Sequence, residues 1–227
     1  MEQHQKSVIL GIGGPSCSGK TTLAQMLARV LGNSCLVHAD DYYKQPGDIP
    51  VHSSSGLPDY DSPESFDAEA MARAIQSAAA QSTRSPASHD SAQLSPDPSP
   101  ASALVFQLGI SETRVVVVEG ISVLSTHKAS APVLSLLSVA VLLDIDYSTA
   151  LARRQARLTN LDCSPDDFWP DPPEYFETVA WPNYRKYCFP QSSSAIYPFF
   201  LSIEQSEPLD SSVEKCLQLI ALASNSF

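Results

Sequence analysis

The sequence is poor in basic residues. It has 14 lysines and arginines against 25 aspartates and glutamates among its 227 residues, a formal net charge of −11. Because a nucleic-acid-binding surface needs clustered positive charge, this balance argues against a nucleic-acid partner. A small phosphorylated ligand met by a few local cations remains compatible with it. The length suits one α/β domain with insertions, so residues 1–227 are predicted to form a single domain.

Long apolar runs are also missing. No run approaches the roughly 18 consecutive apolar residues that mark a membrane span, and the first residues contain no apolar stretch of the signal-peptide type. The five cysteines are odd in number and form no C-x-x-C pair, which argues against a disulfide framework or a zinc site. We therefore expect a soluble, cytoplasmic protein with free thiols and no membrane partner. The sequence leaves its oligomeric state open.

The most informative feature is a segment that fits the phosphate-binding pattern G-x-x-x-x-G-K-[ST]. An apolar strand is expected before it, over Ser7–Gly13, and apolar residues recur at helical spacing after it, over 20–31. Main-chain N–H groups of such a loop and the dipole of the helix attract phosphate. The alternative is an ordinary glycine turn before a helix. The predicted nucleotide-binding residues are Gly14, Pro15, Ser16, Cys17, Ser18, Gly19, Lys20, Thr21 and Thr22.

Strands and helices alternate along the chain, which predicts an α/β protein with the P-loop NTPase fold, a mostly parallel central sheet flanked by helices. Residues 82–102 are rich in Ser, Pro and Ala without a hydrophobic period, so we predict a disordered insertion there. Further strands are expected over 35–39, 114–118, 139–145 and 195–203, and further helices over 66–80, 148–158, 175–187 and from about 211.

Acidic residues follow two of the expected strands. Asp40 and Asp41 follow the second strand, and Glu119 follows a run of four valines. In open α/β sheets this carboxyl edge is where ligands bind. Asp40 is therefore the candidate general base for an acceptor hydroxyl, and Asp40, Glu119 and the hydroxyl of Thr21 are candidate Mg²⁺ ligands. The alternative is that both aspartates only begin a loop.

Three arginines lie on the expected helix of 148–158. Arg153 and Arg157 share a face at this spacing, and Arg154 lies close beside them. A basic helix that follows a strand is what a lid over phosphates requires, so residues 148–173 are predicted to form a helical lid. The alternative is a solvated helix face.

A phosphate-binding loop alone does not separate kinases from GTPases, ATPases or sulfotransferases. No guanine-binding run of the N-K-x-D type is found, and a helicase or motor is hard to fit into this length. The carboxylate after the second strand favours a small-molecule kinase, since such an enzyme needs a proton acceptor near the γ-phosphate.

Six segments of the chain resemble the nicotinamide riboside kinases, relatives of uridine kinase among the P-loop nucleoside kinases. They stand in family order and cover most of the chain outside 82–102. The phosphate-binding loop is generic, whereas the second, third and last segments are much more specific. The segments are G-I-G-G-P-S-C-S-G-K-T-T-L-A at 11–24, D-D-Y-Y-K at 40–44, L-P-D-Y-D at 57–61, V-V-V-V-E-G at 115–120, A-R-R-Q-A-R at 152–157, and D-P-P-E-Y-F with W-P-N-Y at 171–184.

The resemblance implies a riboside pocket. Tyr60 would stack on the pyridine ring, while Asp61 and Arg154 would hold the ribose 2′- and 3′-hydroxyls, since a carboxylate accepts from a diol and a guanidinium donates to it. The ring is cationic when attached to ribose, so aromatic faces and nearby carboxylates favour it. The candidate substrate-binding residues are Asp40, Asp41, Tyr43, Tyr60, Asp61, Arg154 and Trp169.

The resemblance also implies ATP and Mg²⁺ as cofactors. Arg153 and Arg157 would contact the ATP phosphates from the lid, and Lys20 would reach the β- and γ-phosphates. Glu119 would lie beside the metal. Catalysis would come chiefly from positioning and charge, with Asp40 as the general base.

The chain departs from the family at two points. Thr159 stands where family members carry a second stacking tyrosine. Phe168 and Trp169 are the candidates for that ring; we favour Trp169, and the alternative is that Trp169 only packs the lid. The loop at 202–206 also lacks the glycine expected beside adenine, which leaves adenine contacts to the main chain.

The implied function is phosphorylation of the ribose 5′-hydroxyl of nicotinamide riboside by ATP, which gives the mononucleotide and ADP in NAD salvage. Nicotinic acid riboside is a second expected acceptor. One alternative keeps the chemistry and changes the acceptor to uridine or cytidine. The other is a non-catalytic, nucleotide-binding regulatory module, and the intact set of Lys20, Thr21, Asp40 and Glu119 argues against it.

Overall fold

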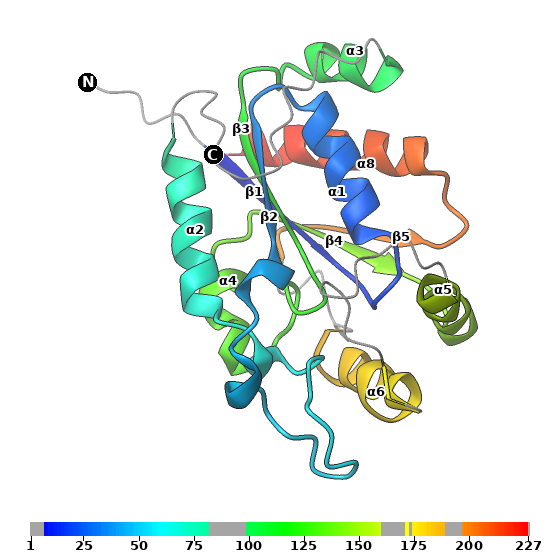
Figure 1. Cartoon of the computed structure of the whole chain (residues 1–227). Coiled ribbons are helices and arrows are strands. Elements are labelled where there is room, and N and C mark those ends of the chain that lie inside the picture. Colours follow the sequence, from blue (N-terminus) through cyan, green and yellow to red (C-terminus); the bar gives the residue numbers. More distant parts are fainter. Residues whose placement is uncertain (1–6, 82–98, 160–170, 173, 189–196, 227) are drawn as a thin grey trace.

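Five parallel strands form the central sheet of the computed structural model, which describes residues 7–81, 99–159, 171–172, 174–188 and 197–226 (Figure 1). The strand order is β2-β3-β1-β4-β5, and every pairing between neighbours is parallel. This confirms the predicted α/β class and the predicted sheet. The strands are β1 (Ser7–Gly13), β2 (Ser34–His38), β3 (Arg114–Glu119), β4 (Val139–Asp144) and β5 (Phe199–Glu204).

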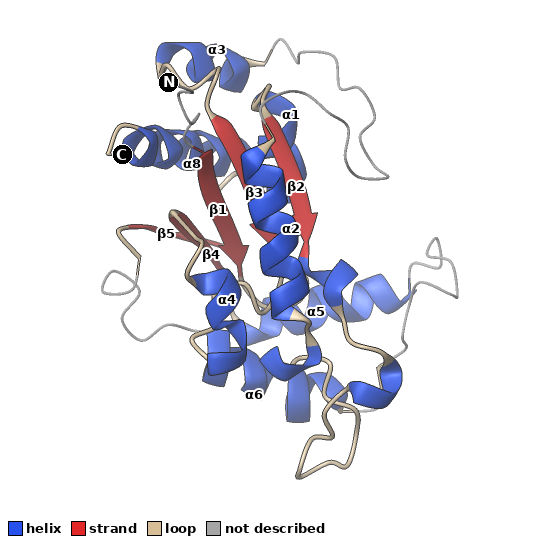
Figure 2. Ribbon diagram, turned by 90° about the vertical axis from the view of Figure 1, so that its left-hand side faces the viewer, coloured by secondary structure: helices blue, strands red, loops and turns tan. Residues whose placement is uncertain are grey.

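Helices cover both faces of the sheet, as the views in Figures 1 and 2 show. The side chains of β3 alternate between the faces, so that Val115 and Val117 pack on one and Val116 and Val118 on the other. A strand buried on both sides reads as a continuous apolar run, which explains the four valines. One face carries α1 (Lys20–Val30), α3 (Pro100–Gln107) and α8 (Leu209–Ser224), and the other carries α2 (Ala68–Ala80) and α4 (Ala131–Leu134).

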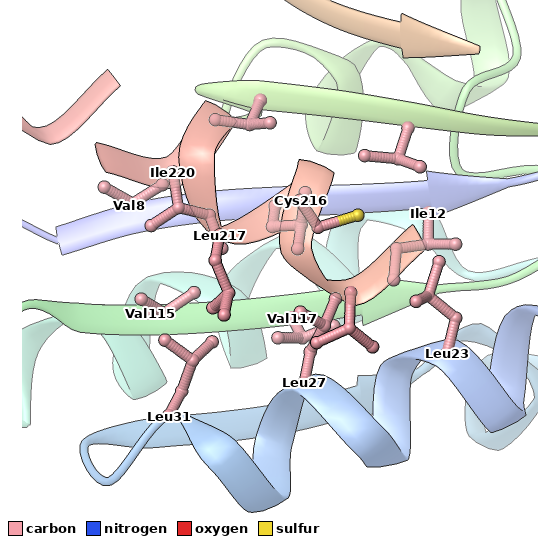
Figure 3. Packing of buried hydrophobic residues seen from close by; sticks show 14 of the residues in the cluster. Val8, Ile12, Leu23, Leu27, Leu31, Val115, Val117, Cys216, Leu217 and Ile220 are labelled. Carbon is pink, nitrogen blue, oxygen red and sulfur yellow. The ribbon is translucent and has the colours of Figure 1, made fainter. Parts of the chain in front are cut away.

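The helix that follows the phosphate-binding loop packs against the sheet and alongside α8 on the same face (Figure 3). Leu23 and Leu27 lie one turn apart on α1 and pack with Val117 and Leu217, all at most 1% exposed. Burial of one such aliphatic side chain contributes about 1.5–3 kcal/mol. These packing contacts therefore hold the N-terminus of α1 at the carboxyl end of β1.

The carboxyl ends of the strands point toward α5 and α6, which lie beyond this edge of the sheet (Figure 2). α5 (Tyr147–Thr159) follows β4, and the helical segment Phe176–Cys188 is composed of η5 (Phe176–Ala180), α6 (Trp181–Asn183) and η6 (Tyr184–Cys188). The turns η5 and η6 are π-helical and flank Pro182, which lacks the N–H that a regular α-helical turn would use. Ile145 and Ala150 pack against this segment in a small separate core.

Two features differ from the expectations. The last three residues of the predicted insertion belong to α3, because Ser99 caps this helix by accepting from the N–H of Ser102 and Val105 is buried in the core. Residues 82–98 lie outside the described part, as does much of the predicted lid of 148–173. Short 3-10 helices were not anticipated: η1 (Ala39–Tyr42), η2 (Pro46–Asp48), η3 (Pro63–Ser65) and η4 (Lys128–Ser130). Among the described helices, none has the length and apolar character needed to cross a membrane.

Candidate active site

The phosphate-binding loop leaves β1 at the centre of the sheet and opens α1. At Gly14 the backbone has φ 147°, and a Cβ there would lie 2.7 Å from the carbonyl oxygen of Leu143. Gly19 has φ 97° at the N-cap of α1, and Cys17 also has a positive φ, 63°. These left-handed residues turn successive main-chain N–H groups toward one side, which is the geometry of an anion-binding nest.

Two buried side chains of this loop fit a phosphate group. The Lys20 Nζ is folded onto the loop, where it donates to the carbonyl oxygen of Pro15 at 2.9 Å. Burial lowers the pKa of Lys20, while the charges of Glu119 and Asp40 act in the opposite direction. The Ser18 hydroxyl is buried with no hydrogen-bond partner among the described residues. A buried unpaired hydroxyl is costly, and a phosphate oxygen would satisfy it.

Two donors meet at Glu119 on the carboxyl edge of the sheet. The Thr21 hydroxyl donates to Glu119 Oε1 at 3.1 Å, and the His38 Nδ1 lies 2.7 Å from the same oxygen. The hydrogen bond to Glu119 raises the pKa of His38, against the effect of burial. His38 ends β2, and a lone histidine at a strand end gave no signal in the sequence. The histidine helps to orient the carboxylate that was predicted to lie beside the metal.

Asp40 and Asp41 lie together in η1, directly after β2. Desolvation by the surrounding protein and the charge of Glu119 raise the pKa of Asp40 above its ordinary value, while Lys20 and Arg157 lower it. Asp41 is exposed, and its charge adds to the rise in the pKa of His38. Asp40 and Glu119 thus lie close enough to repel each other, which a bound cation would relieve.

Thr21, Asp40 and Glu119 suit Mg²⁺ better than a metal with an all-protein cage. No group of three His, Cys, Asp or Glu residues that could hold a metal occurs in the described ranges. Mg²⁺ commonly takes one or two carboxylates, keeps several waters and shares substrate phosphate oxygens. One hydroxyl and two carboxylates beside a phosphate-binding loop fit that pattern.

The lid arginines divide into two groups. The Arg153 Nη1 lies 3.4 Å from the carbonyl oxygen of Cys17 in the phosphate-binding loop, and Arg157 is near enough to lower the pKa of Asp40. Arg154 points elsewhere and forms a two-point ion pair with Asp171, with Nε–Oδ2 at 2.5 Å and Nη2–Oδ1 at 2.7 Å. The structure thus places Arg153 beside the phosphate-binding loop, Arg157 near Asp40 and Arg154 beside Asp171, and the ligand contacts expected of the three arginines stay predictions.

Aromatic rings and one carboxylate lie together in the part of the site expected to hold the phosphate acceptor. We call this part the acceptor side, and it includes Tyr43, Tyr60 and Asp61. Tyr43 stacks on Phe66 with ring centroids 4.3 Å apart, and it meets Tyr60 edge-on at 5.8 Å. Burial raises the pKa of Tyr43 well above its ordinary value, and the charges of Asp40 and Asp61 raise it further. The structure therefore brings the predicted Tyr43, Tyr60 and Asp61 together with the predicted base.

Asp61 is half-buried beside these rings. Burial raises its pKa to about 6, and the charge of Arg154 and a hydrogen bond from Tyr175 oppose the rise. Arg154 and Asp61 interact through their charges, while the guanidinium of Arg154 donates hydrogen bonds to Asp171. Sequence reasoning missed Asp171, because an aspartate before two prolines looks like an ordinary loop residue.

Two hollows flank the loop. The first lies between Pro15 and Asp61 on one side and Phe176, Trp181 and Tyr184 on the other. Trp181 was assigned no role from the sequence, and Trp169 and Phe168, the candidates for the second stacking ring, lie outside the described residues.

The second hollow has a volume of about 200 Å³ on the nucleotide side of the loop. It is lined by the first turn of α1, by Arg153, by Glu204 at the end of β5 and by Gln205 and Glu207 beyond it. The Gln205 amide donates to Asp146, the residue that caps α5, at 2.6 Å. Residues 202–204, expected in a loop, belong to β5, and Gln205 ties the segment that follows this strand to the start of the lid helix.

Comparisons with known proteins agree with this geometry. Residues 9–161 match the family model described as "Phosphoribulokinase / Uridine kinase family". Nicotinamide riboside kinase 2 of Mus musculus is 31% identical over 180 residues, which cover 79% of this chain and 79% of the relative. Nicotinamide riboside kinase of Schizosaccharomyces pombe is 29% identical over 189 residues, 79% of this chain and 78% of the relative.

Solved structures support the fold. A structure from Silicibacter sp. TM1040 aligns with a TM-score of 0.54 at 18% identity and covers 89% of this chain and 92% of that one. A sugar kinase from Janibacter sp. HTCC2649 aligns with a TM-score of 0.50 at 11% identity, over 96% and 97%. The fold, the sequence matches and the P-loop kinase geometry confirm the predicted resemblance and the predicted kinase class. The chain belongs to the phosphoribulokinase/uridine kinase family and, within it, groups with the nicotinamide riboside kinases.

Proposed function

We propose that this chain transfers the γ-phosphoryl group of ATP, with Mg²⁺, to the ribose 5′-hydroxyl of nicotinamide riboside. The observation that carries the proposal is one edge of the sheet where Lys20, Asp40 and Glu119 meet the aromatic pair of Tyr43 and Tyr60. The names of the relatives at 29–31% identity support the choice of acceptor. Nicotinic acid riboside is a second acceptor in this proposal, and the product enters NAD salvage in the cytoplasm.

Asp40 acts as the general base. It accepts the proton of the 5′-hydroxyl as that oxygen forms a bond to the γ-phosphorus and the bond to the β–γ bridging oxygen breaks, which releases ADP. The raised pKa of Asp40 makes it a better proton acceptor than an ordinary aspartate. Mg²⁺, when bound, neutralises charge on the phosphates, and Thr21 and Glu119 with Asp40 are the residues that would hold it.

Cationic groups act on the phosphates. Lys20 is oriented by its contact with the loop, and Arg153 already reaches the loop from α5. Both act on charge that spreads over the transferred phosphoryl group, where fixed cations are effective because water is excluded.

The riboside lies on the acceptor side. Its cationic ring faces the rings of Tyr43 and Tyr60, and the ribose 2′- and 3′-hydroxyls donate to Asp61 and accept from Arg154. Since Asp171 occupies the Nε–Nη2 edge of Arg154, donation to the ribose comes from Nη1 or from the second hydrogen of Nη2.

The test is ADP release by the purified protein with Mg-ATP and a panel of acceptors: nicotinamide riboside, nicotinic acid riboside, uridine, cytidine and none. We expect turnover with the pyridine ribosides. Asp40→Asn should lower kcat by about 10²–10⁴-fold and leave ATP binding intact, while the exposed Asp48→Asn serves as the matched control. Turnover with pyrimidines alone would overturn the acceptor assignment, and equal turnover by Asp40→Asn would overturn the assigned base.

A further inference from the structure

Tyr175 joins the two parts of the chain that form the acceptor side. It is 1% exposed and precedes η5, the start of the helical segment after the lid, whereas Tyr60 and Asp61 lie in the loop before α2. It belongs to the D-P-P-E-Y-F segment of the family resemblance, but the sequence assigned it no role, because an aromatic before a helix is usually a core residue.

The hydroxyl of Tyr175 has two partners in that loop. It accepts from the main-chain N–H of Tyr60 at 3.1 Å and donates to the carboxylate of Asp61. Because the main-chain N–H can only donate, its bond leaves the hydroxyl hydrogen to Asp61, which fixes the direction of the network. Burial and the charge of Asp61 raise the pKa of Tyr175, so the hydroxyl keeps its proton at physiological pH.

The ring of Tyr175 faces a third residue of the acceptor side. The Arg154 guanidinium carbon lies 5.9 Å from the centre of this ring and 5.5 Å from that of Phe176. Cations favour such positions over aromatic faces. One buried side chain thus contacts the main chain of the predicted stacking residue, the predicted diol carboxylate and the predicted diol cation.

We propose that Tyr175 is a positioning residue for the riboside: its hydroxyl holds the Asp61 carboxylate and the Tyr60 main chain in register, and its ring supports Arg154. This rests on the proposed function. Tyr175 acts through these residues and does not touch the reacting atoms.

The first experiment compares Tyr175→Phe with the wild type in the ADP-release assay. The variant keeps the ring and removes the hydroxyl. We expect the KM for nicotinamide riboside to rise about tenfold, in line with loss of a hydrogen bond to a charged group, and the KM for ATP to stay within about twofold. Tyr197→Phe is the matched control, since the buried Tyr197 hydroxyl donates to the Leu124 carbonyl oxygen away from this network. It should change neither KM.

A double-mutant cycle tests whether Tyr175 acts through Asp61. In an Asp61→Ala background, which removes the group that accepts from Tyr175, Tyr175→Phe should add less than about a twofold further loss in kcat/KM for the riboside. A merely structural role would lower kcat/KM by the same factor in both backgrounds. Additive effects would therefore overturn the proposal.

The pH profile gives a second readout that also serves if Tyr175→Phe folds poorly. The charged and titratable groups that face Asp61 are Arg154, Tyr175, Asp59 and Asp171, together with Tyr43, Lys20 and Cys188. We expect an acid limb near pH 6 in kcat/KM for the riboside in the wild type. In Tyr175→Phe this limb should shift to higher pH, because the hydroxyl no longer stabilises the carboxylate.

The outcomes separate the two proposals. A wild type that phosphorylates only uridine or cytidine overturns the proposed acceptor, and the same comparison then tests Tyr175 with that nucleoside, because the ribose is shared. Equal changes in the riboside and ATP KM values, or an unshifted acid limb, would overturn the role of Tyr175. A wild type that turns over no nucleoside would overturn both proposals.

Discussion

Replacement of Asp61 by asparagine should stabilise the protein while it weakens riboside binding. The pKa of Asp61 is about 6 in the fold against an ordinary value of 3.8, so the native state binds more protons than the unfolded chain between these pH values. Stability therefore falls as the pH rises through this window. A difference of about two pKa units lowers the free energy of unfolding at pH 7 by about 3 kcal/mol relative to a protein without this ionisable group. This is an upper value because the side chain is partly exposed.

Asparagine removes the charge and can still accept from Tyr175. Asp61→Asn should thus unfold at higher urea, with a gain of up to about 3 kcal/mol at pH 7 and about half of that at pH 5, where the wild-type carboxyl is largely protonated. Its kcat/KM for nicotinamide riboside should fall about 10–100-fold, since hydrogen bonds to a charged group are lost. The exposed Asp48→Asn is the control and should stay within about 0.5 kcal/mol of the wild type.

Two results would contradict this expectation: Asp61→Asn is less stable than the wild type at pH 7, or its gain in stability is the same at pH 5 and pH 7. The first result would mean that Arg154 and Tyr175 more than offset the desolvation of Asp61. The second would mean that the gain comes from something other than the buried charge.

Three further changes test other parts of the site. Lys20→Ala should lower kcat by about 10³-fold in the ADP-release assay, because a fixed cation at the phosphates is lost, and a smaller effect than tenfold would contradict this role. Gly14→Ala should lower the free energy of unfolding by more than about 1 kcal/mol in a urea titration, since its Cβ would meet a main-chain carbonyl of β4 at 2.7 Å, whereas Gly47→Ala has open space and should be neutral. Asp171→Asn should raise the riboside KM about tenfold by weakening the hold on Arg154, and an unchanged KM would show that this ion pair does not position the guanidinium.

The sequence predicted those parts of the site that follow from local patterns. The strand, glycine loop and helix around 7–31 need only hydrophobic periodicity and a motif, and β1 has the predicted bounds. Asp40 and Glu119 were placed together because carboxyl ends of parallel strands share one edge, and the charge of Glu119 does raise the pKa of Asp40.

The parts that could not be predicted depend on how distant segments approach one another. The ion pair of Arg154 with Asp171 needs the path of the lid, and the hydrogen bond of Tyr175 with Tyr60 joins residues 115 positions apart. No periodicity specifies such contacts. The start of α3 was missed for another reason: Ser99 and Pro100 are a capping serine and a first-turn proline, but within a Ser- and Pro-rich run they looked like low complexity.

Negative charge prevails among the ionisable side chains at the centre of the site. Asp40, Asp61 and Glu119 all act on one buried ammonium group, that of Lys20. Carboxylates outnumber this cation, and the raised pKa values of Asp40 and Asp61 show that the fold is destabilised by holding them ionised. Under the proposed function, both Mg²⁺ and the pyridinium ring bring positive charge to this group, while the phosphates meet the loop and the lid arginines. A neutral pyrimidine riboside offers the same ribose hydroxyls without that charge, so this arrangement favours a cationic acceptor over a neutral one.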